Sequence, residues 1–484
     1  MKRLKLHPAW LLALGVIFMG GAHLTFNVEI LAWFCAVPFL LYLRWTKGLL
    51  SRIYFILAMI LSWSFAVFKI ITDPIPYLMI PLYSVPIALV QIPGYIIWSR
   101  MRDRHYSYLL FPSIMVVMEW IQYTMTPLGS WGAAAYAMVD QIILLQFGSV
   151  FGLAGISFII YLINVVVAEW IIDPSGTKTK LVPVGLVFAA IMIYGSLRID
   201  YYSSRSKKQI KVAAVGTDSK VGGLPLPAAE IRESNRERLI ERTEKAASSG
   251  AKLIVWNEAS TVILPDEEEA WKKRLSSVSG NNQITLISSY IVLLSKQSFR
   301  YENKYVMYLP DGTEACTYHK HQPVPGEPAR KGNEPIETVS LAGIDIGGAI
   351  CYDYDFPKLA QSYGQLGADI VGLPSSDWRG IDPIHTKMAA YRAIEQGHSI
   401  LRSTRFGLSA AINPIGIVEA QMSSFNQNDQ IMIAYLPETK VFTLYGVIGD
   451  LFIYVCMVLI GIYMFWILDT RFKKSVILAS KIFM

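Results

Sequence analysis

Three residues in the second half of the chain have side chains that could together transfer an acyl group. Glu258 lies in the segment KLIVWNEAS, Lys320 in TYHKHQPVPGEP and Cys351 in GGAICYDYDFP. A cysteine attacks acyl carbons as a thiolate, so it needs a base or a positive charge nearby. A lysine can stabilise the oxyanion that forms, and a glutamate can take the thiol proton. These three residue types suffice for acyl transfer from an ester or an amide.

Each of the three residues also has an ordinary structural interpretation. Cys351 could be a small buried residue of a strand, because free cysteine is often buried. Lys320 could be a solvated side chain, and Glu258 could cap a following helix. The residue types alone therefore leave the choice between a catalytic and a structural role open.

The other cysteines and the histidines suggest neither a disulfide framework nor a metal site. Two of the four cysteines, Cys35 and Cys456, lie in strongly apolar segments, which leaves only Cys316 and Cys351 outside them. His319 and His321 flank Lys320 but lack partners at zinc-ligand spacing. Glycine motifs of nucleotide-binding loops are absent as well. We expect no metal and no cofactor.

The elements that must position these side chains read as strands alternating with helices. We expect strands at 209–216, 252–260, 283–294, 304–320 (broken by a turn at 310–312), 345–357 and 368–376, helices at 229–250, 358–367 and 385–399, and a hairpin from 400 to 416. This pattern predicts an α/β domain that includes antiparallel strand pairs. Glu258, Lys320 and Cys351 would then stand at the ends of separate strands, where α/β folds collect reactive groups.

The remainder of the chain has the composition of a membrane protein. Of its 484 residues, 53% are hydrophobic and only 17% are charged, with a mean hydropathy of +0.37. Candidate membrane spans of suitable length lie near 7–24, 28–45, 53–72, 77–98, 108–124, 149–171, 181–197 and 445–468. We predict a membrane domain at 1–200 with about seven transmembrane helices, a catalytic domain at 201–440, and a final transmembrane helix with a basic cytoplasmic tail at 441–484.

Basic residues predict the orientation of these spans. They cluster at alternate ends of the spans, at Lys2, Arg3, Lys5, Arg44, Lys47, Arg52, Arg100, Arg102, Arg104, Lys178, Lys180, Arg471, Lys473, Lys474 and Lys481. Because short cytoplasmic loops carry the excess of Lys and Arg, both termini are expected in the cytoplasm and the 201–440 domain on the opposite side. A cleaved signal peptide is the alternative interpretation of 1–22, but the alternation of charge favours its retention. The net charge of +7 mostly reflects these basic residues at the ends of the spans, so we expect no nucleic-acid binding.

The soluble part resembles the nitrilase (carbon–nitrogen hydrolase) superfamily in its motifs WNEAS, TYHKHQPVPGEP and ICYDYDFP, and in their order. The resemblance implies an αββα sandwich, with Glu258 as general base, Lys320 as the oxyanion-stabilising group and Cys351 as nucleophile. Glu327, in VPGEP, resembles a second glutamate near the triad. Tyr352 and Asp353 follow the cysteine and would support the site.

The arrangement of spans around this domain, together with the stretch 127–160, resembles the apolipoprotein N-acyltransferase family of the bacterial envelope. That resemblance implies a multi-pass inner-membrane enzyme with its catalytic domain on the periplasmic side. Its cysteine would take an acyl chain from a phospholipid, such as phosphatidylethanolamine, as a thioester. The acceptor would be the amino group of an N-terminal diacylglyceryl-cysteine in a lipoprotein.

Two other functions remain open on the sequence alone. One is a membrane-bound amidase, or an acyltransferase that acts on a different amine. The other is a non-catalytic homologue that binds lipid or lipoprotein. The presence of Glu258, Lys320 and Cys351 together favours an enzyme.

A few residues of the membrane part could contribute to such a site. Glu119 lies inside a predicted span, and carboxylates there are commonly functional, although it could also lie near a lipid interface or pair within the bundle. Trp131, Tyr136 and Trp378 could flank a groove for an acyl chain, or serve as ordinary packing and interfacial residues.

Overall fold

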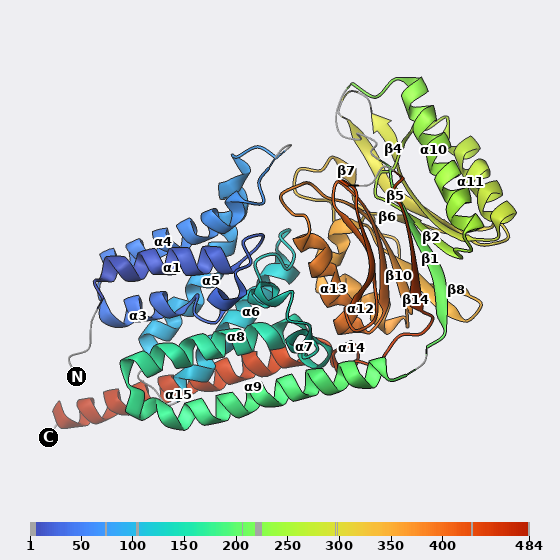
Figure 1. The fold of residues 1–484 in the computed structure, drawn as a ribbon. Helices are drawn as coiled ribbons and strands as arrows, with labels where there is room; N and C mark the ends of the chain where they lie inside the picture. Colours follow the sequence, from blue (N-terminus) through green and yellow to red (C-terminus); the bar gives the residue numbers. More distant parts are fainter. Residues whose placement is uncertain are drawn as a thin grey trace.

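The computed structural model describes residues 6–482 except 73–74, 103–105, 206, 218–224, 296, 298 and 427–428, and of 467–482 it describes the backbone only. Four of the basic residues used above for orientation, Lys2, Arg3, Lys5 and Arg104, therefore lie outside the described residues. The side chains of Arg471, Lys473, Lys474 and Lys481 do so as well. A helical bundle and an α/β unit lie side by side, and the first and last described residues lie at the end of the bundle far from the α/β unit (Figure 1).

The α/β unit contains two sheets. The larger has the strand order β14-β1-β2-β4-β5-β6, with β3 paired to β4 and β7 to β5, and the smaller has the order β13-β12-β11-β10-β9-β8. The strands of the larger sheet are β1 (Gln209–Val215), β2 (Leu253–Trp256), β3 (Val262–Ile263), β4 (Thr285–Ser295), β5 (Arg300–Tyr308), β6 (Glu314–His319), β7 (Ala329–Arg330) and β14 (Ile431–Pro437). Those of the smaller are β8 (Val339–Leu341), β9 (Ile344–Gly348), β10 (Ile370–Ser376), β11 (Ser399–Arg405), β12 (Leu408–Ile412) and β13 (Val418–Ser423).

The packing of these sheets follows from the alternation of side chains along each strand. In β1, Val212 and Ala214 face an apolar core shared with the smaller sheet, whereas Ala213 and Val215 face helices α10 (Ala229–Ser248) and α11 (Glu268–Asn282). On the outer face of the smaller sheet lie α12 (Pro357–Gln365) and α13 (Ile384–Gln396). The unit is therefore a four-layer αββα sandwich, as the sequence resemblance implied (Figure 1).

The bundle is built from the apolar segments of both ends of the chain. Its helices are α1 (Pro8–Ala22), α2 (Glu29–Ala32), α3 (Val37–Trp45), α4 (Leu49–Phe68), α5 (Met79–Met101), α6 (Ser107–Met125), η1 (Ala134–Met138), α7 (Ile142–Leu145), α8 (Gly148–Ile172), α9 (Pro174–Ser203), α14 (Leu444–Ile448) and α15 (Leu451–Ile482). Among the described residues, α4, α5, α8 and α9 are long and apolar enough to cross a membrane. α1 and Leu451–Trp466 are shorter apolar helices.

Two predicted elements take a different form in the structure, and helix α11 and strand β14 were not among the predicted elements. The predicted span 28–45 is not one helix, because a turn at residues 33–36 separates α2 from α3. The predicted strand 345–357 ends at Gly348, and the chain then forms the short 3-10 helix η2 (Cys351–Asp355). Apolar periodicity cannot distinguish a buried strand from a buried turn that continues it.

Helix α13 joins the sandwich to the bundle. Arg392 forms an ion pair with Glu395 at 2.8 Å and donates to the Tyr136 hydroxyl at 3.0 Å. Glu395 in turn accepts a hydrogen bond of 2.7 Å from the backbone N–H of Leu153, which becomes available because α8 is interrupted at Gly152 (φ +62°). These groups are buried, so the two parts of the chain share a polar junction that excludes water.

Candidate active site

Glu258 and Lys320 are brought together by the larger sheet. Glu258 follows the end of β2, and Lys320 follows the end of β6. The Lys320 ammonium donates to Glu258 Oε1 and to Glu327 Oε2, at 2.8 Å each. Both ends of this pair are buried, with 4% of Glu258 and 2% of Lys320 exposed.

Asn303 completes this network from the neighbouring strand β5. Its side-chain amide donates to Glu258 Oε1 at 2.7 Å and to Glu327 Oε1 at 2.9 Å. Glu327 also accepts from the backbone N–H of Val324 at 2.9 Å. The two carboxylates are thus held by one lysine and one amide, which fixes their positions relative to each other.

Cys351 stands at the first residue of η2 in a strained backbone conformation. Its φ is +49°, a left-handed conformation that non-glycine residues adopt at a cost. The thiol donates to the Ser376 carbonyl at the end of β10, with an Sγ–O distance of 3.5 Å. The turn needs Gly348 before it, because a Cβ there would lie 2.6 Å from the Tyr305 ring. The chain therefore places a single thiol at the point where η2 and β10 meet.

The electrostatics of the site keep the thiol protonated at rest. Burial, together with the negative charge of Glu258, raises the pKa of Cys351 well above its usual range, although Lys320 acts in the opposite direction. Burial alone would lower the pKa of Lys320, but Glu258 and Glu327 outweigh it and raise that pKa well above its usual value. Burial raises the pKa of Glu327, yet the charge of Lys320 lowers it overall. A neutral thiol beside an ion-paired carboxylate suits attack with simultaneous proton removal.

Asp353 and Tyr352 have supporting positions. Asp353 is fully buried and accepts from the Ile350 and Gln322 backbone N–H groups and the Tyr318 hydroxyl, at 3.0, 2.7 and 2.8 Å. Burial raises the pKa of Asp353 to about 6, against the opposing charge of Lys320. Asp353 thus ties the turn at Cys351 to the segment after Lys320. The Tyr352 hydroxyl donates to the Pro127 carbonyl at 2.8 Å and so links the same turn to the bundle.

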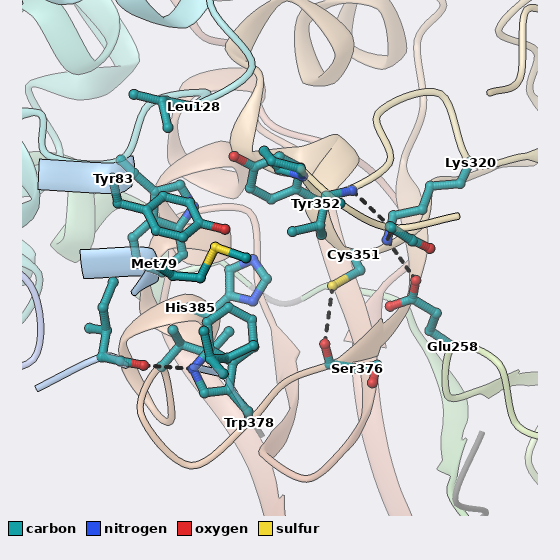
Figure 2. A pocket seen from close by; sticks show the side chains of 18 of the residues that line it. Met79, Tyr83, Leu128, Glu258, Lys320, Cys351, Tyr352, Ser376, Trp378 and His385 are labelled. Atoms are coloured by element: carbon teal, nitrogen blue, oxygen red, sulfur yellow. Dashed lines mark hydrogen bonds and ion pairs between the residues drawn. The ribbon is translucent and has the colours of Figure 1, made fainter. Parts of the chain in front are cut away.

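A cavity of about 380 Å³ lies between the sandwich and the bundle, and Asp353 is not among the residues that line it. Glu258, Lys320, Glu327, Cys351 and Tyr352 line one side of it. The bundle supplies an apolar side, made of Leu24, Val67, Ile70, Ile71, Ile75, Met79, Tyr83, Ile87, Leu128 and Trp131. Figure 2 shows Met79, Tyr83 and Leu128 on one side of the view and Lys320 and Glu258 on the other, with Cys351 between them.

Of the aromatic residues considered from the sequence, Trp131 and Trp378 line this cavity, whereas Tyr136 does not. Tyr136 is buried at the junction, where its hydroxyl lies 2.8 Å from Ser130 Oγ. Glu119 lies away from the cavity and accepts from the Ala134 backbone N–H and the Tyr161 hydroxyl, at 2.9 and 2.8 Å. Among the described residues, Glu119 therefore pairs within the bundle, which was one of the two alternative interpretations.

Sequence reasoning missed several polar residues that the structure places at the cavity. Among them are Asn303, Ser376, His385 and Arg405. Ser376 ends a strand that was predicted, so its place at a strand end was a usable signal. Asn303 and His385 carried no such signal, because each is adjacent to the site only through long-range pairing of strands and packing of α13.

One group near the thiol has the residue types of a metal site. The candidate ligand atoms of Cys351, Asp377 and His385 lie within 4.8 Å of one another. Arg402, however, donates to both carboxylate oxygens of Asp377, at 2.9 Å to Oδ1 and 3.1 Å to Oδ2. A guanidinium already occupies the side of the carboxylate that a cation would need, so these residues do not fit a metal ion.

Comparison with known proteins gives matches over both parts of the chain. Residues 211–440 match the carbon-nitrogen hydrolase family model, and residues 14–166 match the apolipoprotein N-acyltransferase N-terminal domain. The apolipoprotein N-acyltransferase of Rickettsia typhi is 25% identical over 71% of this chain and 74% of its own length. That of Rickettsia bellii is 24% identical over 81% and 84%, and apolipoprotein N-acyltransferase 1 of Treponema denticola is 22% identical over 96% and 97%.

Among solved structures, an amidase from Nesterenkonia sp. aligns with 17% identity and a TM-score of 0.40, over 49% of this chain and 92% of the amidase. The curated relatives span the bundle as well as the sandwich, and the two family models match the two parts in the order in which they occur here. Over both of its parts the chain is therefore similar to the apolipoprotein N-acyltransferases, with a carbon–nitrogen hydrolase domain following the bundle.

Proposed function

We propose that the protein transfers a fatty acyl chain from a phospholipid, through a thioester on Cys351, to the N-terminal amino group of diacylglyceryl-cysteine in apolipoproteins. One observation carries this proposal. A single cavity joins Glu258, Lys320 and Cys351 to an apolar wall that belongs to the membrane bundle. A soluble amide substrate would not need such a wall, whereas an acyl chain that enters from a bilayer would.

In the first half of the reaction, Glu258 takes the proton of the Cys351 thiol as the sulfur attacks the ester carbonyl carbon. Lys320 donates to the oxyanion of the tetrahedral intermediate. The intermediate collapses by breaking the carbon–oxygen bond of the ester, and Glu258 returns the proton to the leaving glycerol oxygen. The products are a lysophospholipid and a thioester on Cys351.

In the second half, the lipoprotein amino group attacks the thioester carbonyl carbon. Glu258 takes a proton from this amine and delivers it to the departing sulfur, so that an amide forms and the thiol is restored. Both substrates are anchored in the bilayer. A cavity that opens between the bundle and the catalytic domain therefore confines the reaction to the membrane surface.

The donor we propose is phosphatidylethanolamine, and the place is the bacterial inner membrane with both termini in the cytoplasm. The basic residues at alternate span ends support this orientation. This orientation would put the catalytic domain on the periplasmic side.

Intact-mass spectrometry of the purified full chain tests this proposal. After incubation with phosphatidylethanolamine vesicles we expect a mass gain of one acyl chain that hydroxylamine removes. A synthetic diacylated lipopeptide with a free amino terminus should discharge the adduct and gain the same mass. If no phospholipid produces an adduct, the proposal fails. If the adduct decays equally fast without lipopeptide, the protein is a hydrolase instead.

Enlarging a side chain on the apolar wall is expected to change the preferred acyl-chain length. Met79 is a half-buried wall residue at the start of α5, and Met79→Trp would fill part of the cavity. We expect the variant to favour donors with shorter chains, with transfer of long chains reduced by roughly tenfold. Donors that differ only in chain length measure this effect.

Leu78→Trp is the matched control, because Leu78 adjoins Met79 in sequence but is 83% exposed and does not line the cavity. Equal chain-length profiles for Met79→Trp and the parent protein would contradict an acyl-chain role for this wall.

A further inference from the structure

His385 lies beside the nucleophile without belonging to the Glu258–Lys320–Cys351 set. It is 4% exposed, lies in the first turn of α13, and lines the cavity. One of its ring nitrogens lies within 4.8 Å of the Cys351 sulfur. Figure 2 shows its ring next to the thiol, on the side away from Lys320.

Both ring nitrogens of His385 are bonded to carboxylates. Nδ1 lies 2.7 Å from Asp377 Oδ1, and Nε2 lies 3.1 Å from Asp355 Oδ1. A neutral imidazole has only one N–H and could donate to one of them, whereas an imidazolium donates to both. The Arg402 guanidinium also lies 3.0 Å from Nδ1, and only a neutral ring could accept a hydrogen bond from it there. The contacts of both ring nitrogens with carboxylates, of which that of Nδ1 is the shorter at 2.7 Å, favour the charged ring over that neutral form.

The two carboxylates belong to the two segments that hold the sulfur. Asp355 is the last residue of η2, the short helix that begins with Cys351. Asp377 follows Ser376, whose carbonyl accepts from the thiol. Asp355 also accepts from the Trp131 indole N–H at 2.8 Å. One imidazole thus connects the nucleophile turn, the end of β10 and, through Asp355, the bundle.

The charges around the ring balance only when it is protonated. The groups that face it are the two carboxylates, the Cys351 thiol and Arg402, which lies 3.0 Å from Nδ1 and pairs with Asp377. Asp355, Asp377 and Arg402 sum to one negative charge, which an imidazolium cancels. Burial lowers the pKa of His385, but Asp355 and Asp377 outweigh it and raise that pKa to about 9.

We propose that His385 is a positioning residue for the acyl transfer: its imidazolium clamps Asp355 to Asp377 and cancels their charge beside Cys351. The inference rests on the proposed function, because it concerns the same nucleophile. His385 does not carry the transferred proton, since both of its N–H groups are engaged. Without its charge, the net negative charge beside the sulfur would oppose formation of the thiolate.

The test compares His385→Gln with the double variant His385→Gln/Asp355→Asn. The single variant leaves one uncompensated negative charge, whereas the double variant restores neutrality while removing one more ionic contact. Alkylation of Cys351 by iodoacetamide, followed by peptide mass mapping across pH, reports thiolate formation without any lipid substrate. His398→Gln, which removes another buried histidine that does not line the cavity, is the control.

For His385→Gln we expect the alkylation midpoint to rise by about one pH unit and thioester formation at neutral pH to fall about tenfold. The double variant should recover most of both losses. If it is as slow as the single variant or slower, His385 acts only as a packing or hydrogen-bonding group and the inference fails.

Asp355→Asn alone provides a second measurement should His385→Gln not fold. This variant leaves the His385 imidazolium and Arg402 against the single negative charge of Asp377, so the pH midpoint of alkylation should fall. An unchanged or higher midpoint would also overturn the inference. Alkylation does not depend on acyl transfer. A parent protein that gains no acyl chain while its variants shift as expected would refute the proposed function but not the clamp.

Discussion

Replacing Cys351 with serine is expected to abolish acyl transfer while the protein still folds. Serine is nearly isosteric with cysteine and can occupy the same turn, but its hydroxyl is a much weaker nucleophile without the activation a serine enzyme provides. We expect the transfer rate to fall by roughly 10⁴-fold or more, as it does when other acyl-transfer enzymes lose their nucleophile. Intact-mass spectrometry should show no hydroxylamine-sensitive adduct.

The matched control is Cys316→Ser. Cys316 is a half-buried cysteine on β6 that does not line the cavity, so this variant should acylate and transfer like the parent. Transfer by Cys351→Ser at the parental rate would assign the nucleophile elsewhere.

Replacing Lys320 with methionine is expected to have the second largest effect, on stability as well as on activity. The change leaves Glu258 and Glu327 buried without their shared cation, and breaking such a buried pair costs about 3–5 kcal/mol of unfolding free energy. The oxyanion also loses its donor, so transfer should be undetectable. Because the two carboxylates would then favour protonation in the folded state, the loss of stability should shrink as the pH falls.

Lys304→Met separates the two effects. Lys304 is likewise buried and pairs with two carboxylates, Glu268 at 2.6 Å and Glu302 at 2.9 Å, but it does not line the cavity. The Lys304→Met variant should therefore lose about as much unfolding free energy as Lys320→Met, but the fraction that remains folded should keep acyl transfer. Thermal unfolding in detergent and acylation of the same samples measure both quantities. Normal transfer by Lys320→Met would show that Lys320 has no part in the chemistry.

Much of the sandwich could be predicted from the sequence, because its strands are short apolar runs bounded by turn residues. β1, β4 and β10 lie within two residues of the predicted bounds, and the turn at 310–312 does separate β5 from β6. The four-layer arrangement could be predicted only from the resemblance to the nitrilase superfamily. Periodicity along one strand does not say which of its two faces meets a second sheet.

The site could be predicted less completely, and the reason is the kind of contact involved. Glu258, Lys320 and Cys351 have distinctive residue types in recognisable motifs, and the structure does bring them to one cavity. The strained turn at Cys351 was predicted as strand, because the apolar residues before it continue the pattern of β9. Asn303 and His385 reach the cavity through partners far away in sequence, which local patterns do not encode.

Glu395 accepts a hydrogen bond from the buried backbone N–H of Leu153, and this contact bears on the order in which the parts of the molecule fold. A buried backbone N–H without an acceptor costs about 1–3 kcal/mol, and this acceptor is synthesised 242 residues after its donor. While the chain is being made, α8 therefore enters the bundle before the residue that completes it exists. The bundle reaches its final packing only when α13 has folded and docked against α8. The catalytic domain therefore completes the fold of the membrane domain that precedes it in the chain.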